Sequence, residues 1–171
     1  MKKPYKSKDS CRLCNSKDLE LVVPLGYSPI SEKYLTRENL NEQQIKVSLD
    51  LYFCNRCTHV QLLDVVDPSF LWSDYTFRTA DNPILVKHFK DIAERILTFN
   101  PMDKNDLIVD IGSNDGTLLK CFKDVGYGNV LGIDPALEIS AEATKRGIPT
   151  IQSFMDEHTA NQVLKKHGKA F

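Results

Sequence analysis

The stretch from Leu107 to Gly116 constrains the fold of this 171-residue chain more than any other. Apolar residues flank Asp110 on both sides, which is typical of a parallel strand that is covered on both faces. The turn that follows contains Gly112 and Asn114, residue types that readily adopt positive φ. A helical pattern follows at once and ends near Gly126. The sequence therefore predicts a strand, a glycine turn and a helix, the unit that presents backbone N–H groups to a nucleotide-like ligand.

An acidic residue farther along the chain supports this prediction. A second strand is expected from Val130 to Ile133, and it ends in Asp134, where a carboxylate would bind a ribose diol. The turn lacks the G-x-G-x-x-G spacing of dinucleotide folds, and Thr117 occupies the position at which a phosphate-binding loop carries Lys. An ordinary tight turn is the alternative interpretation, but it accounts for neither the helix nor the acidic residue.

The composition limits the classes of partner. A formal net charge of −1 gives no long-range attraction to nucleic acid or to acidic membranes. No apolar run is as long as a membrane span, and the first residues lack the apolar core of a signal peptide. We therefore expect a cytoplasmic protein with neither nucleic acid nor a membrane as a partner. The lysine-rich start of the chain is expected to be a solvated tail.

Four of the five cysteines form two C-x2-C pairs, Cys11 with Cys14 and Cys54 with Cys57. Zn²⁺ binds four thiolates in a tetrahedron, and each pair can direct two sulfurs at one ion. A redox-active pair of the thioredoxin type would lie beside a βαβ pattern, whereas both pairs precede any such pattern. The sequence therefore predicts a structural zinc ion with no open position for catalysis. His59 follows the second pair and is interpreted as a surface residue or as a group that supports a ligand.

The 39 residues between the two pairs exceed the usual spacing of a zinc ribbon, so additional structure is expected there. The capping preference of serine and the alternation of apolar residues suggest a short helix and several strands. The expected elements are a strand at Leu19–Leu25, a turn-rich loop at Gly26–Ser31, a short helix capped by Ser31 and ending near Gln43, and strands at Ile45–Phe53 and Val60–Leu63.

The segment from Asp67 to Arg78 is dense in aromatic residues, and two interpretations stay open. It is either a hydrophobic lid or linker, or a wall of a substrate or cofactor site to which Tyr75 supplies a hydroxyl. A helix is then expected to start at Pro83 and to end at Asn100. This helix carries His88, which is more often a satisfied, partly buried histidine than a base.

Beyond Asp134 the helical and strand patterns continue to alternate. Phe154 and Met155 follow the third of the expected strands. The expected elements are a helix at Ala136–Arg146, a strand at Ile148–Gln152 and a helix at Asp156–His167.

Several short motifs occur together in this chain. They are Cys11-Arg-Leu-Cys14, Leu25-Gly-Tyr-Ser-Pro-Ile, Cys54-Asn-Arg-Cys57 with Val60-Gln-Leu, Tyr75-Thr-Phe77, His88, Val109-Asp-Ile-Gly-Ser-Asn-Asp-Gly-Thr-Leu-Leu119 and Gly132-Ile-Asp-Pro-Ala136. In this combination they resemble the zinc-containing sugar C-methyltransferases. The glycine turn itself resembles motif I of the class I S-adenosylmethionine-dependent methyltransferases, and Asp134 matches the acidic residue of motif II.

The resemblance implies an α/β fold, in which a small four-cysteine zinc-ribbon domain precedes the first half of a Rossmann-like class I methyltransferase domain. The implied boundaries are a zinc-binding domain at 1–75, a connecting helix at 76–104 and the first part of the cofactor-binding domain at 105–171. The implied cofactors are S-adenosylmethionine and structural Zn²⁺. The implied substrate is a nucleotide-linked 4-keto deoxysugar, methylated on a ring carbon.

The resemblance also assigns roles at the cofactor site. It implies that Asp110 binds the amino group of the cofactor or an ordered water, and that Gly112 allows close backbone approach. Asn114 and Gly116 would shape the turn. Asp134 would bind the ribose hydroxyls, and Phe154 or Met155 would flank the adenine. Carbon methylation also requires a base beside the ketone. Tyr75 and His88 are the candidates for that role within this chain.

In the family that this chain resembles, the catalytic His and Tyr residues lie in a region that would follow Phe171. The chain is therefore expected to be part of a longer enzyme, or to be completed by a partner. The strand at Leu107–Ile111 would then lack a neighbour on one side, and such an edge favours self-association or binding of another chain. Two other functions stay open: a non-catalytic docking module, and a protein that binds NAD or a nucleotide sugar.

Overall fold

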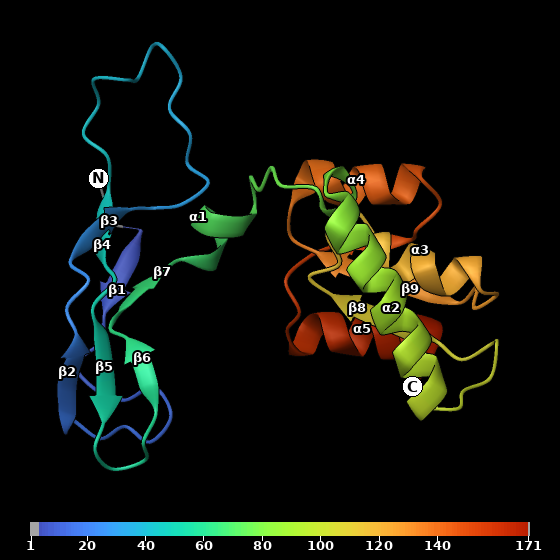
Figure 1. Ribbon diagram of the computed structural model, residues 1–171, viewed down its shortest axis with the longest axis horizontal. Coiled ribbons are helices and arrows are strands. Elements are labelled where there is room, and N and C mark those ends of the chain that lie inside the picture. The colour runs from blue at the N-terminus through green and yellow to red at the C-terminus, as the bar shows by residue number, and fades with distance from the viewer. Residues whose placement is uncertain (1–3, 171) are drawn as a thin grey trace. The chain divides into compact units, whose positions relative to one another are not determined.

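The computed structural model describes residues 4–170, which divide into two compact units, one ending at Leu71 and one beginning at Trp72 (Figure 1). Together they form a mixed α/β chain. Each unit is described by itself. In the described part of the chain, no helix has the length and apolarity that crossing a membrane would require.

The first unit consists mainly of short antiparallel strands. A three-stranded sheet has the order β2-β5-β6, and two further pairs are β3 with β4 and β1 with β7. The elements are β1 (Tyr5–Ser7), β2 (Leu19–Val23), β3 (Tyr27–Pro29), β4 (Lys46–Ser48), β5 (Leu51–Cys54), β6 (Val60–Leu62), β7 (Asp64–Val66) and, at the boundary, the short helix α1 (Pro68–Trp72). The strands predicted at Leu19–Leu25 and Val60–Leu63 are thus confirmed as β2 and β6, and each ends slightly earlier than predicted.

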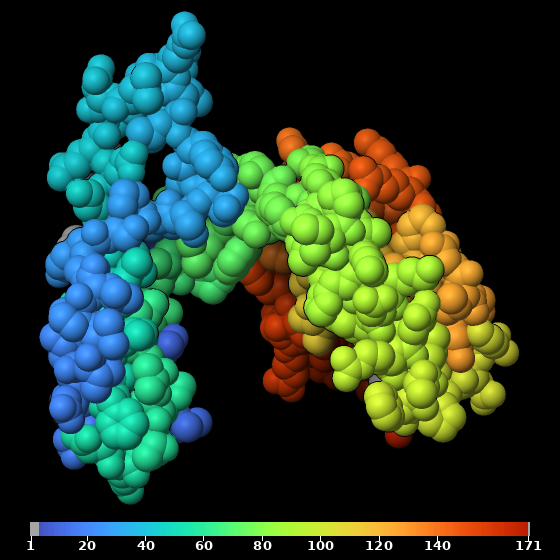
Figure 2. Space-filling model, in the orientation of Figure 1, coloured from blue at the N-terminus to red at the C-terminus, as the bar shows by residue number. Residues whose placement is uncertain are grey.

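The helix predicted from Ser31 to Gln43 is wrong, because this segment forms turns and irregular structure. Glu32 has a φ of 61°, which is incompatible with a right-handed helix. The side chain of Asn39 accepts a hydrogen bond from the backbone N–H of Thr36 at 2.7 Å, so a local turn competes with the helix. The segment also offers little apolar surface to bury. In Figure 2 it projects from the rest of its own unit.

The strand predicted at Ile45–Phe53 is divided into β4 and β5, which pair with different partners. The carboxylate of Asp50 accepts the backbone N–H of Gly26 at 2.7 Å and fixes the break between them. The expectation of a loop at Gly26–Ser31 is wrong over β3, which pairs with β4. The expectation of a solvated tail is wrong over β1, which pairs with β7.

The second unit contains a parallel sheet of the order β10-β9-β8. Its strands and helices match the sequence predictions closely. The elements are a 3₁₀ turn at Thr79–Asp81, α2 (Pro83–Phe99), β8 (Ile108–Ile111), α3 (Thr117–Asp124), β9 (Val130–Asp134), α4 (Leu137–Lys145), β10 (Thr150–Gln152) and α5 (Glu157–His167). The predicted start of α2 at Pro83 is confirmed, and the side chain of Asn82 caps the helix by accepting the backbone N–H groups of Ile84 and Leu85.

Helices cover both faces of this sheet (Figure 1). On one face, α2, α3 and α4 surround a core that includes Ala93, Leu119 and Ala143. On the other face, Val163 of α5 packs with Leu107, Leu131 and Ile133 of the sheet region. Alternate residues of β9 therefore enter opposite cores, as expected for a strand that is buried on both faces.

One of the two edges of the sheet lies at β8. Within the described residues, Ile108–Ile111 pair with β9, and Leu107 forms a parallel bridge with Ala170. The strand edge that was predicted to lack a neighbour thus has a partner at Leu107. Association through the rest of the edge stays a prediction.

The position of Gly116 makes it sensitive to substitution. Its φ is 78°, and an added Cβ would lie 2.8 Å from Cγ2 of the buried Ile148. We expect Gly116→Ala to lower the free energy of unfolding by about 2 kcal/mol or more, because backbone strain and overpacking add. Gly147→Ala is the matched control, since Gly147 also has positive φ but no atom lies within 4 Å of the added Cβ. Urea unfolding followed by circular dichroism compares the two, and equal losses would contradict the packing argument.

Candidate functional site

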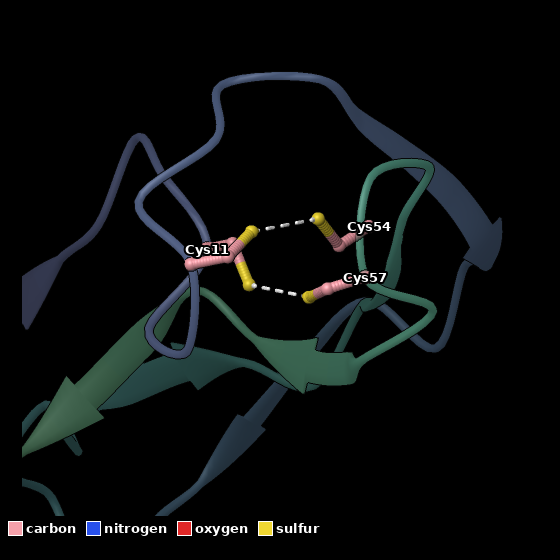
Figure 3. Close-up of side chains that lie close together, drawn as sticks. Cys11, Cys54 and Cys57 are labelled. Atoms are coloured by element: carbon pink, nitrogen blue, oxygen red, sulfur yellow. Dashed lines mark hydrogen bonds between the residues drawn. The ribbon is translucent and has the colours of Figure 1, made fainter.

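The four cysteines of the two C-x2-C pairs converge in the first unit. Their sulfur atoms all lie within 4.8 Å of one another, and the Cys11–Cys57 and Cys14–Cys54 sulfurs are each 3.6 Å apart. Figure 3 shows the side chains of Cys11, Cys54 and Cys57 directed toward a common centre. A tetrahedral Zn²⁺ with bonds of about 2.3 Å places its sulfurs about 3.8 Å apart. The donor set therefore fits the predicted zinc ion.

The two cysteine turns have the same backbone geometry. In each turn the first cysteine donates its N–H to the carbonyl five residues ahead, that of Ser16 or His59, at 2.8 or 2.9 Å. Its own carbonyl accepts an N–H from the residue four positions ahead, Asn15 or Thr58, and both of these residues have φ near 60°. Each turn thus directs its sulfurs through backbone hydrogen bonds.

A buried glutamine supports the first turn. Gln61 of β6 is 2% exposed, accepts the backbone N–H of Arg12 at 2.9 Å and donates to the carbonyl of Ser10 at 3.3 Å. Burial raises the pKa of the Cys11 thiol, but hydrogen bonds from the backbone of Cys14 and Leu13 outweigh it and lower the pKa to about 7. The turn therefore favours the thiolate, the form that binds zinc. His59 lies outside the metal-binding group found among the described residues.

A second candidate site lies in the second unit, at the carboxyl ends of the parallel strands. A cavity of about 340 Å³ opens there beside the glycine turn. This is the edge of a parallel sheet at which α/β proteins bind their ligands. The cavity is lined by Trp72, Tyr75, Ile111, Gly112, Asn114, Ile133, Asp134, Pro135, Ser153, Phe154 and Met155. It brings together six of the residues singled out from the sequence: Tyr75, Gly112, Asn114, Asp134, Phe154 and Met155.

The glycine turn has the backbone conformation predicted for it. Gly112, Asn114 and Gly116 have φ values of 75°, 50° and 78°. A Cβ on Gly112 would meet no atom within 4 Å, so its backbone faces open space at the cavity. The turn therefore allows close approach of a ligand at Gly112, while Gly116 is required by packing against Ile148.

Asp134 is 7% exposed and holds this end of the site together. One carboxylate oxygen accepts the backbone N–H of Asn114 at 2.8 Å, and the other accepts that of Ala136 at 2.9 Å. Because each carboxylate oxygen can accept two hydrogen bonds, both retain capacity for a ligand hydroxyl.

Asp110 lies behind the turn rather than on the larger cavity. It lines a smaller cavity of about 110 Å³ together with Thr79, Phe89, Ser113 and Thr117. Burial raises the pKa of the Asp110 carboxyl, and the nearby charge of Asp134 raises it further. Ser113 Oγ, on the same cavity, is buried without a hydrogen-bond partner. The small cavity therefore has unmet polar capacity that suits a water molecule or a polar ligand group.

The two candidates for proton transfer are placed differently. The ring of Tyr75 lines the larger cavity and packs edge-on against Trp72, with ring centroids 5.3 Å apart. His88 is exposed on α2, and its ring contacts that of Phe89. The structure thus brings Tyr75, but not His88, to the cavity.

Sequence reasoning missed the role of Asp115 and Thr79. Asp115 is 3% exposed; one of its oxygens accepts from the backbone and hydroxyl of Thr117, and the other accepts the N–H of Ala80 at 2.9 Å. The side-chain oxygen of Asn114 likewise accepts the backbone N–H of Thr79 at 2.9 Å. The bond of Asp115 to Thr117, two residues ahead, is a local turn of a kind that aspartate often forms, so this contact was readable from the sequence, whereas the contact with Ala80 was not.

Comparisons with known proteins agree with the zinc site. Residues 11–72 match the family model Methyltransf_13, which describes a zinc-binding domain. Over 162 residues, or 95% of this chain, the sequence is 28% identical to the C-methyltransferase NovU of Streptomyces niveus. The chain spans 38% of the length of that relative. Both matches confirm the resemblance that the sequence motifs predicted.

The cysteine cluster gives a direct prediction for metal. We expect the purified chain to contain one equivalent of zinc, and we expect Cys14→Ser to lose it because three thiolates remain. Cys121→Ser is the control, since Cys121 lies on α3 and donates to the carbonyl of Thr117. Elemental analysis and circular dichroism in chelator measure both effects. A chain that folds fully without metal would contradict a structural role.

The raised pKa of Asp110 gives a prediction for stability. An acid whose pKa is higher in the folded state stabilises the fold only while protonated, and this contribution disappears as the pH rises through the folded pKa. Asp110→Asn is therefore expected to raise the free energy of unfolding at pH 7, with a smaller gain at pH 5. Asp91→Asn, at an exposed position of α2, is the control. Denaturant unfolding at both pH values measures the difference, and a larger gain at pH 5 would contradict this assignment.

Proposed function

We propose that this chain, whose residues 11–72 match a methyltransferase-associated zinc-binding domain, acts in S-adenosylmethionine-dependent C-methylation. Its similarity to a C-methyltransferase supports the reaction class. The observation that carries the proposal is the cavity at the carboxyl ends of β8 and β9, where Gly112, Asp134 and Phe154 meet. The residue types around this cavity suit a nucleoside ligand.

The topology of the second unit supports the same proposal. Three parallel strands in the order β10-β9-β8 are joined through α3 and α4, and we propose that they form the first half of a Rossmann-like sheet. In such a sheet the nucleoside lies across the ends of the first two strands, and these are β8 and β9 here. We therefore propose that the second unit is the donor-binding module.

Several residues of the larger and the smaller cavity have roles in this proposal. Asp134 would accept the ribose hydroxyls on the oxygen capacity left by its two backbone hydrogen bonds. Gly112 would allow the ligand to approach the backbone. Phe154 and Met155, 37% and 40% exposed, would flank the adenine with apolar surface. Asp110 and the orphaned Ser113 Oγ would bind polar atoms of the methionine part or an ordered water.

When bound, S-adenosylmethionine supplies an electrophilic methyl group. The remaining task of the protein is to align the acceptor carbon, exclude water and remove a proton from it. Tyr75 is the group of this chain best placed for contact with the acceptor, because it lines the cavity. We propose a nucleotide-linked 4-keto deoxysugar as the acceptor, from the motifs shared with sugar C-methyltransferases. A carbon next to a ketone is acidic enough for such chemistry.

The zinc ion would have a structural role. Protein sulfurs would fill all four ligand positions of the ion, so no position would be open to a substrate. Among the described residues of the first unit, the buried apolar side chains are few: Cys11, Ile30, Val47 and Cys54. A unit with so small a core depends on a metal ion for stability.

Calorimetric titration with S-adenosylhomocysteine tests the proposal. We expect the zinc-loaded chain to bind it, and we expect Phe154→Ala to weaken the affinity about tenfold through loss of aromatic contact. Phe99→Ala is the matched control, because Phe99 is 74% exposed at the end of α2 and does not line the cavity. Titrations with NADH and with a dTDP-sugar examine the other nucleotide ligands.

The outcomes separate the two classes of function. Binding of the homocysteine analogue, weakened by Phe154→Ala alone, supports a methyltransferase. A folded chain that binds none of these ligands would favour the non-catalytic docking module instead. Binding of NADH or the dTDP-sugar without the methyl-donor analogue would favour a different nucleotide-binding protein.

A further inference from the structure

The side chain of Asn114 makes three of its four possible hydrogen bonds with protein. Its Oδ1 accepts the backbone N–H of Thr79 at 2.9 Å and the hydroxyl of Thr79 at 3.3 Å. Its Nδ2 donates to the carbonyl of Phe77 at 2.9 Å. Meanwhile its backbone N–H is bound by the carboxylate of Asp134. Asn114 therefore connects the glycine turn to a segment 35 residues earlier in the chain.

Two neighbouring contacts strengthen this connection. The buried carboxylate of Asp115 accepts the N–H of Ala80 at 2.9 Å. On the same segment, Arg78 donates two hydrogen bonds, of 2.7 and 2.6 Å, to the carboxylate of Glu142 on α4. Such a paired contact fixes orientation as well as distance. The residues from Phe77 to Ala80 are thus held from both sides, by the turn and by α4.

This held segment immediately follows the aromatic wall of the cavity. Trp72 and Tyr75 line the cavity, and Tyr75 also contacts Phe77, with ring centroids 6.5 Å apart. We propose that Asn114 and Asp115 are positioning residues, which fix the Trp72–Tyr75 wall over the cavity by hydrogen bonding to residues 77–80. This inference rests on the proposed function for the identity of the ligand, but the contacts themselves require no ligand.

The arrangement has a consequence for specificity. The same turn that offers Gly112 to the donor also determines where the Tyr75 hydroxyl lies, so donor binding and acceptor alignment depend on one structure. Asn114 acts by holding the wall, because its amide oxygen and nitrogen are already bound to Thr79 and Phe77. Loss of its side chain should therefore loosen the wall before it abolishes donor binding.

Asn114→Gly in the full zinc-loaded chain tests this role, because glycine accepts the φ of 50° while removing the side chain. Hydrogen exchange at the Thr79 amide should become about fivefold faster or more, since its acceptor is lost. Trp72, the single tryptophan of the chain, reports on the wall. In the wild type S-adenosylhomocysteine should shield it from acrylamide quenching, and in Asn114→Gly the shielding should be smaller although binding persists.

Asn105→Gly is the matched control, because Asn105 is exposed near the opposite end of β8. Thr79→Pro is the second variant, and it removes the donor from the other side. Proline is compatible there, because Arg78 is extended, with φ −112° and ψ 127°, and Thr79 begins the 3₁₀ turn. It should reduce the shielding of Trp72 as Asn114→Gly does, which gives a readout if Asn114→Gly does not fold.

The positioning role would be overturned if hydrogen exchange at the Thr79 amide were unchanged in folded Asn114→Gly. It would also be overturned if the shielding of Trp72 were unchanged in Thr79→Pro. Failure of the proposed function is recognised separately, because the wild type would then not bind S-adenosylhomocysteine. In that case faster exchange at Thr79 in Asn114→Gly would still support the positioning role, whereas the methyl-donor assignment would fall.

Discussion

The second unit depends on one carboxylate, that of Asp134. It ends β9, and its two oxygens accept backbone N–H groups from the turn after β8 and from the residue that precedes α4. The turn after β8 and the connection between β9 and α4, which are separate in the sequence, are thereby joined at one point. Because the group is 7% exposed, these hydrogen bonds are largely protected from competition by water. The cavity exists at this place because the strand ends are held there.

The sequence was most informative where local geometry and chemistry coincide. The positive φ values of Gly112, Asn114 and Gly116 follow from the residue types themselves. The convergence of the four cysteines follows from the C-x2-C spacing and the coordination preference of zinc. The strand β9 was predicted well, since it is buried along its whole length and carries an apolar run.

The remainder was decided by contacts between distant residues. The break between β4 and β5 depends on Asp50 binding Gly26, and the pairing of β1 depends on β7. None of these partners can be read from a local pattern. The same limit applies to the site, because the contact of Asn114 with Thr79 joins two segments that no motif relates.

The support that Gln61 gives to the first cysteine turn bears on how the metal site assembles. Gln61 holds the backbone around Cys11 from β6, and matched backbone hydrogen bonds shape both turns. Protein contacts therefore offset part of the entropy of ordering these turns, and the bonds to the metal would offset the rest. Metal binding and folding of the first unit are thus coupled, so the affinity of the site would include the cost of ordering the turns. Release of the ion, conversely, would require the strands around β6 to open, which makes the lifetime of the bound metal a property of the sheet.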